Sequence, residues 1–339
     1  MTVDSCVLPA SVRVPGLGDP LLDRYVVFVA SRARPNTVLA TVSDLRAFFA
    51  VVGKGPREVG PADVLEFIAE QRRPRGQASV VRLVDGEAGL SSRTIKRRLS
   101  SVSGLYSWLL ILGEVTANPV PRGLSTRRAR GPRGVVPLVR APRTLPRVLE
   151  PGEVDALLGA LRRWRDRAMV EAMVLGGLRR CEVLGLRSQD LRPGEGRVFI
   201  ADGKGGHQRL VPISKRFFRS LSHYLAGERP EQASTEYVFV VLKGPNRGQP
   251  LTADGLDEII RGARVRAGLS HATCHELRHT CLTRLREAGM ALEAIQAQAG
   301  HRSIESTRLY LHLSNEWLAG EYARAAQLID ATAAVTVTA

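Results

Sequence analysis

The segment HELRHTCLTRL, residues 275–285, carries two histidines and an arginine at helical spacing. His275 and His279 are four residues apart and Arg278 follows His275 by three, so a helix places all three side chains on one face. With Glu276 the segment also spells HExxH, in which two histidines bind zinc and the glutamate acts as general base. The segment therefore predicts a helix with one of two chemistries, a zinc site or a phosphate-binding site.

The zinc interpretation has little support from the neighbouring residues. The extended protease pattern needs a glycine and a third histidine where this sequence has Leu282 and Leu285. Arg278 would also lie beside the dication, and like charges close together in a partly dry site are costly. A distant carboxylate such as Glu293 or Glu305 could complete a ligand set. The zinc protease stays as an alternative, and the main expectation is no metal and no cofactor.

The charge of the chain favours a polyanionic partner. Its 339 residues include 49 Lys and Arg against 33 Asp and Glu, a net charge of +16. Such an excess of cations is typical of nucleic-acid-binding proteins, because each neutralised phosphate releases condensed counterions. The expected partner is double-stranded DNA.

Composition excludes other classes. The chain is 44% hydrophobic, and no apolar run reaches the roughly 18 residues that a membrane helix needs. The N-terminal residues show no export signal, and the four cysteines form no CxxC pair. We expect a reduced, cytoplasmic and nucleoid-associated protein with no membrane partner.

Periodicity predicts a mainly α fold with a small β-hairpin or sheet. Helical spacing dominates residues 19–112, whereas residues 196–214 alternate around a glycine-rich turn and predict a hairpin. EYVFVVL, residues 236–242, predicts another strand. Later helices are expected at about 253–267, 274–289, 291–298, 304–312 and 315–329. The expected order is a flexible N-terminus over 1–18, a helical domain over 19–114, a basic linker over 115–148, a mixed α+β domain over 149–330 and a flexible tail over 331–339.

Two basic stretches are candidate DNA contacts. The first turns of the helix expected at 91–113 are crowded with cations, which oppose the helix dipole and would be offset by a phosphate backbone. Residues 115–149 contain eight arginines and no acidic residue, so this linker could follow phosphates. The candidates are Arg93, Lys96, Arg97, Arg98, Arg127, Arg128 and Arg130.

Four separate motifs supply groups suited to phosphodiester chemistry. Arg179 lies at a helix boundary with Glu182 three residues later, where a carboxylate can orient the guanidinium. Lys204 lies at the hairpin tip, and the helix 275–285 adds a histidine and an arginine. His301 precedes a helix start, and Tyr310 follows about two turns later.

This order of motifs resembles the tyrosine recombinases, also called the phage integrase family. The resemblance rests on GLRRCE (177–182), the hairpin lysine, HELRHT (275–280) and GHRSIESTRLY (300–310). NTVLATVSDLRAFF (36–49) resembles the helical core-binding domain of that family, and the likeness covers roughly residues 19–328. It implies a core-binding domain over 19–114 and a catalytic domain over 149–330.

The resemblance also implies residue roles. Tyr310 would attack the scissile phosphate and form a 3′-phosphotyrosyl link, with Lys204 protonating the leaving 5′-oxygen. Two arginines would hold the non-bridging oxygens, and two histidines would assist. The implied catalytic set is Arg179, Lys204, His275, Arg278, His301 and Tyr310, with Glu182 and His279 in support.

The family pattern implies strand exchange without metal or ATP, in a homo-tetramer or a heteromeric synaptic complex on DNA. The helix expected at 315–329 would dock on a neighbouring protomer; its alternative is packing on its own domain. Since no further domain precedes residue 19, we expect a simple site-specific recombinase or transposase. A type IB topoisomerase and a DNA-binding regulator with an inactive site remain alternatives.

Overall fold

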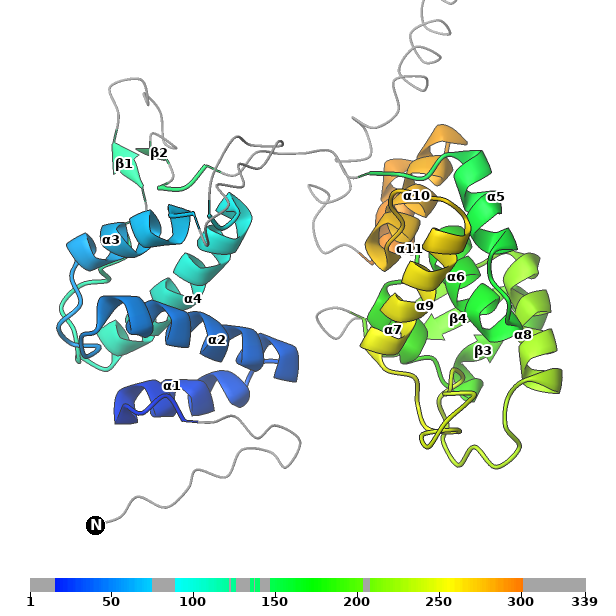
Figure 1. Cartoon of the computed structure of the whole chain (residues 1–339), viewed down its shortest axis with the longest axis horizontal. Helices are drawn as coiled ribbons and strands as arrows, with labels where there is room; N and C mark the ends of the chain where they lie inside the picture. The colour runs from blue at the N-terminus through cyan, green and yellow to red at the C-terminus, as the bar shows by residue number, and fades with distance from the viewer. Residues whose placement is uncertain are drawn as a thin grey trace, which may run out of the picture. The chain divides into compact units, whose positions relative to one another are not determined.

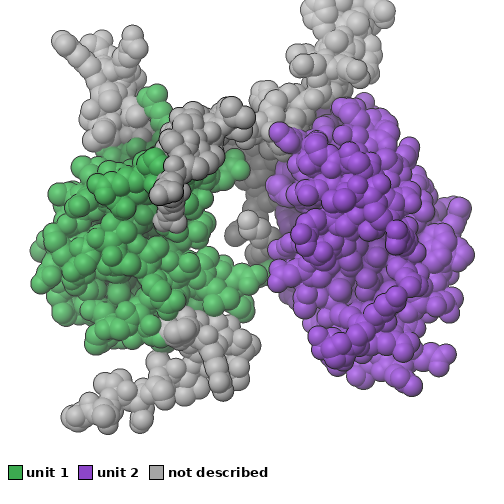
Figure 2. All heavy atoms as spheres, viewed as in Figure 1, with its two compact units in different colours: residues 1–143 green, residues 144–339 purple. Residues whose placement is uncertain are grey.

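The computed structural model describes residues 16–74, 89–121, 123–125, 135–136, 138–140, 147–203 and 208–300. The chain divides into two compact units, residues 1–143 and residues 144–339 (Figure 2). Each unit has its own hydrophobic core. The division between the units falls within the segment predicted as a basic linker, 115–148.

Within residues 19–114, which the sequence predicts to be helical, the described part of unit 1 consists of helices and short connections. Its helices are α1 (Pro20–Ala30), α2 (Pro35–Val52), α3 (Pro61–Arg72) and α4 (Ser92–Ile111), as Figure 1 shows. Proline at the first position starts each of the first three, where its missing N–H costs nothing. Gly53, with φ 65°, ends α2 in a left-handed conformation that favours glycine. The buried core includes Phe48, Phe67 and Tyr106.

The predicted linker contains a short strand pair. Residues Leu124–Ser125 form β1 and Val135–Val136 form β2, which pair antiparallel. The proline and arginine content of this segment predicted only an extended chain. The β-branched pair at 135–136 is the local feature that favours a strand there.

Unit 2 is built around a buried helix. Its helices are α5 (Pro151–Gly159), α6 (Trp164–Gly176), α7 (Arg180–Leu184), α8 (Lys215–Gly227), α9 (Ala253–Arg266), α10 (Cys274–Glu287) and α11 (Leu292–Ala299), with 3₁₀ turns at Ser188–Asp190 and Pro193–Glu195. α6 contacts α7, α8 and α10 (Figure 1). Ala168, Met169, Ala172 and Met173 of α6 are completely buried. A helix buried on several sides is a rigid support for the elements around it.

The sheet of unit 2 has the order β3 (Leu191–Arg192), β4 (Arg197–Ile200) and β5 (Arg209–Pro212), all antiparallel. In the β4–β5 ladder, Ile200 pairs with Arg209, so the connection that contains Lys204 begins directly after this pair. The predicted hairpin is therefore confirmed, and with it the mainly α fold with a small sheet.

The prediction of a strand at 236–242 is wrong. Only isolated bridges occur there, between Arg187 and Tyr237 and between Val240 and Pro250. Val238 donates its N–H to Leu186, so the segment bonds to neighbouring loops instead of to a continuous strand. Its central residues Val238, Phe239 and Val240 are buried, and burial in an irregular segment produces the same hydrophobic run as a buried strand.

The later helices agree with the sequence. α9, α10 and α11 confirm the helices predicted at 253–267, 274–289 and 291–298 to within a few residues. The helices predicted at 304–312 and 315–329 and the tail at 331–339 lie outside the described residues. No helix within the described ranges combines the length and apolar character that a membrane crossing requires.

Candidate active site

Helix α10 carries the central residues of the site. The side chain of Thr273 caps the helix by accepting a 3.2 Å hydrogen bond from the N–H of Glu276. Leu277 and Leu282 are completely buried, so the apolar side of the helix fixes it in unit 2. Arg278 is only 4% exposed, which requires close partners for its charge.

Two main-chain carbonyls hold the guanidinium of Arg278. Its Nη1 donates to the carbonyl of Gly177, directly after α6, and its Nη2 donates to the carbonyl of Ala299, at the end of α11, at 2.7 Å. The Nη1 also lies 3.9 Å from Oε2 of Glu182. Arg278 therefore connects the ends of two helices that are distant in the sequence.

Arg179 reaches the same carboxylate from the start of α7. Gly177, with φ 68°, ends α6, and Arg179 then takes the N-cap position of α7. Its main-chain N–H donates to Oε2 of Glu182 at 2.9 Å, and its Nη1 donates to Oε1 at 2.7 Å. The orienting role predicted for Glu182 corresponds to these contacts. The side chain of Arg179 remains 19% exposed, so solvent or a ligand can reach it.

Arg209, at the start of β5, is a functional candidate that the sequence reasoning missed. Its Nη1 and Nη2 donate to the two carboxylate oxygens of Glu182, both at 2.9 Å, in a bidentate ion pair. A signal was available in the strand: Arg209 lies two residues before Val211, so it shares the buried face of β5, and a cation on an inward strand face needs a partner.

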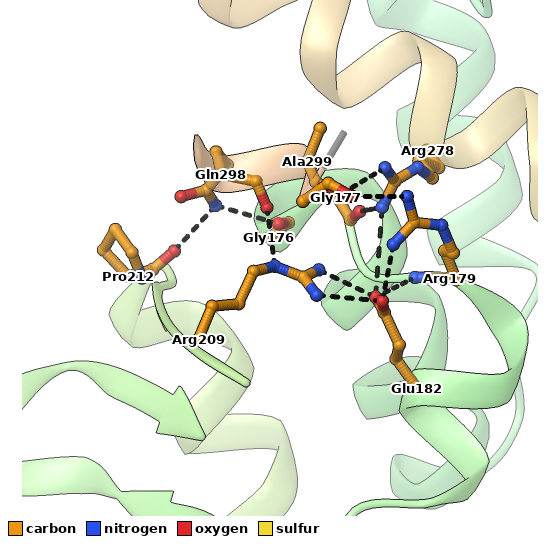
Figure 3. Close-up of polar contacts among 10 residues, drawn as sticks. Gly176, Gly177, Arg179, Glu182, Arg209, Pro212, Arg278, Gln298 and Ala299 are labelled. Atoms are coloured by element: carbon orange, nitrogen blue, oxygen red, sulfur yellow. Dashed lines mark hydrogen bonds and ion pairs between the residues drawn. The ribbon is translucent and has the colours of Figure 1, made fainter. Parts of the chain in front are cut away.

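Glu182 is the carboxylate on which these groups converge (Figure 3). Its side chain is completely buried. Burial alone would raise the pKa of Glu182, but hydrogen bonds and charge from Arg209, then from Arg179, outweigh it and lower the pKa to about 2. Glu182 is therefore ionised at neutral pH and holds its guanidinium partners by charge.

The C-terminal end of α11 accepts a hydrogen bond from each of the three arginines. The carbonyl of Gln298 accepts from Arg209 at 3.2 Å, and the carbonyl of Gly300 accepts from Arg179 at 3.1 Å. Together with the bond from Arg278 to Ala299, these contacts satisfy carbonyls that have no partner within a helix (Figure 3). Cations at this end also match the helix dipole. The segment that carries His301 and Tyr310 starts directly after this anchored end.

His275 and His279 contact each other. Their Nε2 atoms are 2.8 Å apart, and the rings meet edge to face at 84°. A hydrogen bond between two imidazole nitrogens needs one donor and one acceptor, so each ring constrains the proton position of the other. His279 is 8% exposed and is well placed to orient His275.

The zinc alternative does not fit the described residues. Among them, no group of three or more His, Cys, Asp or Glu could hold a metal ion. The Nε2 atoms of His275 and His279 face each other in a hydrogen bond, and Oε1 of Glu276 lies 3.5 Å from His271. Arg278, three residues after His275 on the same helix, would place a positive charge close to any metal ion held by these histidines.

A buried carboxylate of unit 1 pairs with cations in the first turns of α4. Asp44 of α2, which is 1% exposed, accepts a 2.6 Å hydrogen bond from Nη1 of Arg97 and lies 3.9 Å from Nε of Arg98. Arg98 also donates to Gln71. Asp44 therefore offsets part of the charge that the sequence assigned to phosphate. Arg93 and Lys96 are exposed on the same turns.

Several predicted residues cannot be placed relative to this cluster. The structure brings together Arg179, Glu182 and Arg278, and it pairs His275 with His279. The predicted residues outside the described ranges are Lys204, His301, Tyr310, Arg127, Arg128 and Arg130.

Comparisons with known proteins identify the family of this chain. Residues 147–316 match the model of the phage integrase family. Tyrosine recombinase XerC of Xanthomonas campestris pv. campestris (strain B100) is 31% identical over 327 residues, which cover 93% of this chain and 91% of the relative. Tyrosine recombinase XerD of Listeria monocytogenes serotype 4b (strain F2365) is 29% identical over 292 residues, which cover 82% and 88%.

Solved structures show the same fold. The Tn1549 transposon integrase in complex with transposon right end DNA has a TM-score of 0.68 at 18% identity, covering 89% of this chain and 98% of that one. The XerH site-specific recombinase bound to palindromic difH substrate has a TM-score of 0.63 at 20% identity, covering 86% and 81%.

Proposed function

Because this chain belongs to the phage integrase family and is a site-specific tyrosine recombinase, we propose that its arginine cluster holds the scissile phosphate of a DNA strand while Tyr310 attacks it. One observation carries the proposal. Arg179 and Arg278 converge on Glu182 and on the end of α11, from which the segment with His301 and Tyr310 continues. Residues 149–330 act as the catalytic domain in this proposal, and residues 19–114 act as the DNA-binding domain.

The two guanidinium groups bind the non-bridging oxygens. In the transition state of phosphoryl transfer, negative charge spreads over these oxygens, and planar guanidinium groups with several donors match that arrangement. Carbonyls and Glu182 already hold Arg179 and Arg278 in fixed orientations. Little reorganisation is then needed when the phosphate charge develops.

The covalent step transfers the phosphoryl group to the tyrosine. The oxygen of Tyr310 forms a bond to phosphorus, the bond from phosphorus to the 5′-oxygen breaks, and the 3′-phosphate remains on the enzyme. His275 takes the tyrosine proton, and Lys204 gives a proton to the leaving 5′-oxygen. His301 donates a hydrogen bond to the phosphate. His279, bonded to His275, orients that ring.

Strand exchange completes the reaction. The 5′-hydroxyl of a second DNA strand attacks the phosphotyrosyl link, releases Tyr310 and restores a phosphodiester. The number of phosphoester bonds does not change, so the reaction needs no ATP. The relatives aligned over most of this chain are named recombinases, which favours strand exchange over the religation that a topoisomerase performs.

DNA contacts extend over unit 1 and the linker. Arg93 and Lys96 are exposed at the start of α4 and contact the phosphate backbone in this proposal, with Arg97 and Arg98 beside them. The linker arginines Arg127, Arg128 and Arg130 follow the backbone further.

The assembly is a homo-tetramer or a heteromeric synaptic complex on double-stranded DNA, with exchange of the helix predicted at 315–329. The solved XerH structure is described as bound to its difH substrate, and a lambda integrase structure is described as a dimer bound to a core site. This enzyme acts in the cytoplasm, at the nucleoid, as an integrase or transposase.

Covalent trapping tests the proposal. A duplex with a nick next to the cleavage site loses the short fragment after cleavage, so the phosphotyrosyl complex accumulates. The wild-type protein should form this complex, and Tyr310→Phe should bind the same DNA without forming it. A covalent complex with Tyr310→Phe would show that another residue is the nucleophile. Arg179→Ala, with binding retained, should lose cleavage by roughly 100-fold or more.

A further inference from the structure

Arg209 belongs to none of the residues that carry the family resemblance, yet its guanidinium makes a bidentate contact with Glu182. Both of its terminal nitrogens bond to the two carboxylate oxygens at 2.9 Å. Its side chain is 11% exposed. An enclosed bidentate pair fixes both partners in position, because two parallel hydrogen bonds remove rotation of the carboxylate.

The carboxylate in turn acts on Arg179. Oε1 of Glu182 accepts from Nη1 of Arg179 at 2.7 Å and from Arg209 at 2.9 Å. Without Arg209, the carboxylate would offset one of the two guanidinium charges of Arg179 and Arg278 that the phosphate needs. Arg209 supplies a further cation that offsets the carboxylate instead.

The backbone around Arg209 holds its guanidinium in place. A Cβ added to Gly300 would lie 3.0 Å from the central carbon of that guanidinium, so a side chain at this position would press against Arg209. Gly300 also has φ 60°, a left-handed conformation that favours glycine. The Nε of Arg209 donates to the carbonyl of Gln298 at 3.2 Å, which orients the two terminal nitrogens of the guanidinium towards Glu182.

A purely architectural role would have to lie in the contact between β5 and α11, but that contact has a separate connection. The side-chain amide of Gln298 donates to the carbonyl of Pro212 at 3.0 Å and to that of Gly176 at 2.9 Å. α11 is therefore tied to β5 and to α6 without Arg209. The distinct contribution of Arg209 is its bidentate ion pair with Glu182.

We propose that Arg209 is a positioning residue of the recombination reaction, which fixes the carboxylate of Glu182 so that Glu182 holds Arg179 against the scissile phosphate. This inference rests on the proposed role of Arg179. Arg209 acts on the transition state only through Glu182, and it does not itself contact the DNA.

A double-variant cycle on single-turnover cleavage tests this chain of contacts. Arg209→Gln should slow formation of the covalent complex by roughly 10- to 100-fold with DNA binding retained, since small displacements of a catalytic group cost about that much. In a Glu182→Gln background, the same change should cost less than about threefold, because residues that act through one another do not add. Arg209→Lys keeps the positive charge but cannot make the bidentate hydrogen bonds of a guanidinium, so it should give an intermediate rate.

The matched control is Arg197→Gln, an exposed arginine on the adjacent strand β4, which should cleave at the wild-type rate. Thermal unfolding of each variant identifies any that are destabilised. For such a variant, the cycle is measured at a temperature below its unfolding transition.

A second substrate separates positioning from a general loss of structure. A methylphosphonate at the scissile position replaces one charged oxygen with a methyl group, so the reacting centre needs less guanidinium charge. The defect of Arg209→Gln should shrink on this substrate, in parallel with that of Arg179→Ala. A structural defect would slow cleavage of both substrates equally.

The outcomes separate this inference from the proposed function. If Tyr310→Phe still forms the covalent complex, the proposed function fails, whatever Arg209 does. If wild type and Tyr310→Phe behave as expected, the inference is overturned by wild-type cleavage in Arg209→Gln, by losses that multiply in the double variant, or by an equal defect on the methylphosphonate.

Discussion

Arg278 on α10 donates a 2.7 Å hydrogen bond to the carbonyl of Ala299, 21 residues later, at the last residue of α11. The guanidinium proposed to bind the phosphate thus also completes the helix that precedes His301 and Tyr310 in the sequence. One side chain connects binding of the phosphate with the backbone that leads to the nucleophile. Substitution of Arg278 should therefore affect both stability and catalysis.

Arg278→Ala should lower the free energy of unfolding of unit 2 by about 3 kcal/mol, because it leaves buried carbonyls and Glu182 without one of their partners. Chemical denaturation monitored by circular dichroism measures this loss. Arg180→Ala is the matched control, since Arg180 is 42% exposed and pairs with an exposed aspartate, Asp257. The control should lose less than about 1 kcal/mol. Equal losses would contradict the anchoring role of Arg278.

Protonation of Glu182 at low pH should lower the free energy of unfolding of unit 2. Burial disfavours its charge, but Arg209 and Arg179 overcome this and hold the folded-state pKa at about 2, below the usual value of 4.5. A depressed pKa contributes stability above the unfolded value, and this contribution is lost as pH falls from about 4.5 through about 2. The contribution is up to about 3 kcal/mol.

Denaturation of wild type and Glu182→Gln between pH 2 and pH 7 tests this dependence. The difference in stability between the two proteins should be largest at neutral pH and should shrink through that acid range. A constant difference would mean that Glu182 titrates alike in the folded and unfolded states.

The predicted residues that form local pairs in the structure share one property. Arg179 with Glu182 and His275 with His279 are three and four residues apart, so the helix geometry that brings each pair together is visible in the spacing. The fold class followed from periodicity in the same way. Glu276 completed HExxH in the sequence, but in the structure it lies beside His271.

The partners that the sequence missed are distant along the chain. Arg209 is 27 residues from Glu182, and Asp44 is 53 residues from Arg97. The carbonyl of Gly300 is 121 residues from Arg179 and has no side chain to mark it. Such contacts depend on how elements pack, and spacing within one element carries no information about them. The buried segment at 236–242 was misassigned for the same reason.

His279 should matter for cleavage but not for binding. Its Nε2 contacts that of His275 at 2.8 Å, so its removal takes away a contact that orients the His275 ring. His279→Ala should slow covalent complex formation by roughly 10-fold or more, within the range that a positioned proton-transfer group provides. His279→Gln, whose amide can also donate or accept, should recover part of the rate. Equal rates for wild type and His279→Ala would rule out an orienting role.

The salt dependence of DNA binding should distinguish the basic residues of α4. Arg93 and Lys96 are exposed, whereas Arg97 pairs with the buried Asp44 at 2.6 Å. A free cation that neutralises a phosphate contributes about 0.9 to the slope of log K against log salt concentration. Arg93→Ala and Lys96→Ala should each reduce the slope by about that amount, and Arg97→Ala by less, because Asp44 already offsets its charge.

Fluorescence anisotropy with a labelled duplex, titrated at several salt concentrations, measures these slopes. Arg73→Ala is a suitable control, since Arg73 lies at the end of α3, is paired with Glu70 and is 74% exposed. It should leave the slope unchanged. If Arg97→Ala reduced the slope as much as Lys96→Ala, Arg97 would have to leave Asp44 when DNA binds. The carboxylate would then act as a placeholder for phosphate, and Asp44→Asn should strengthen DNA binding.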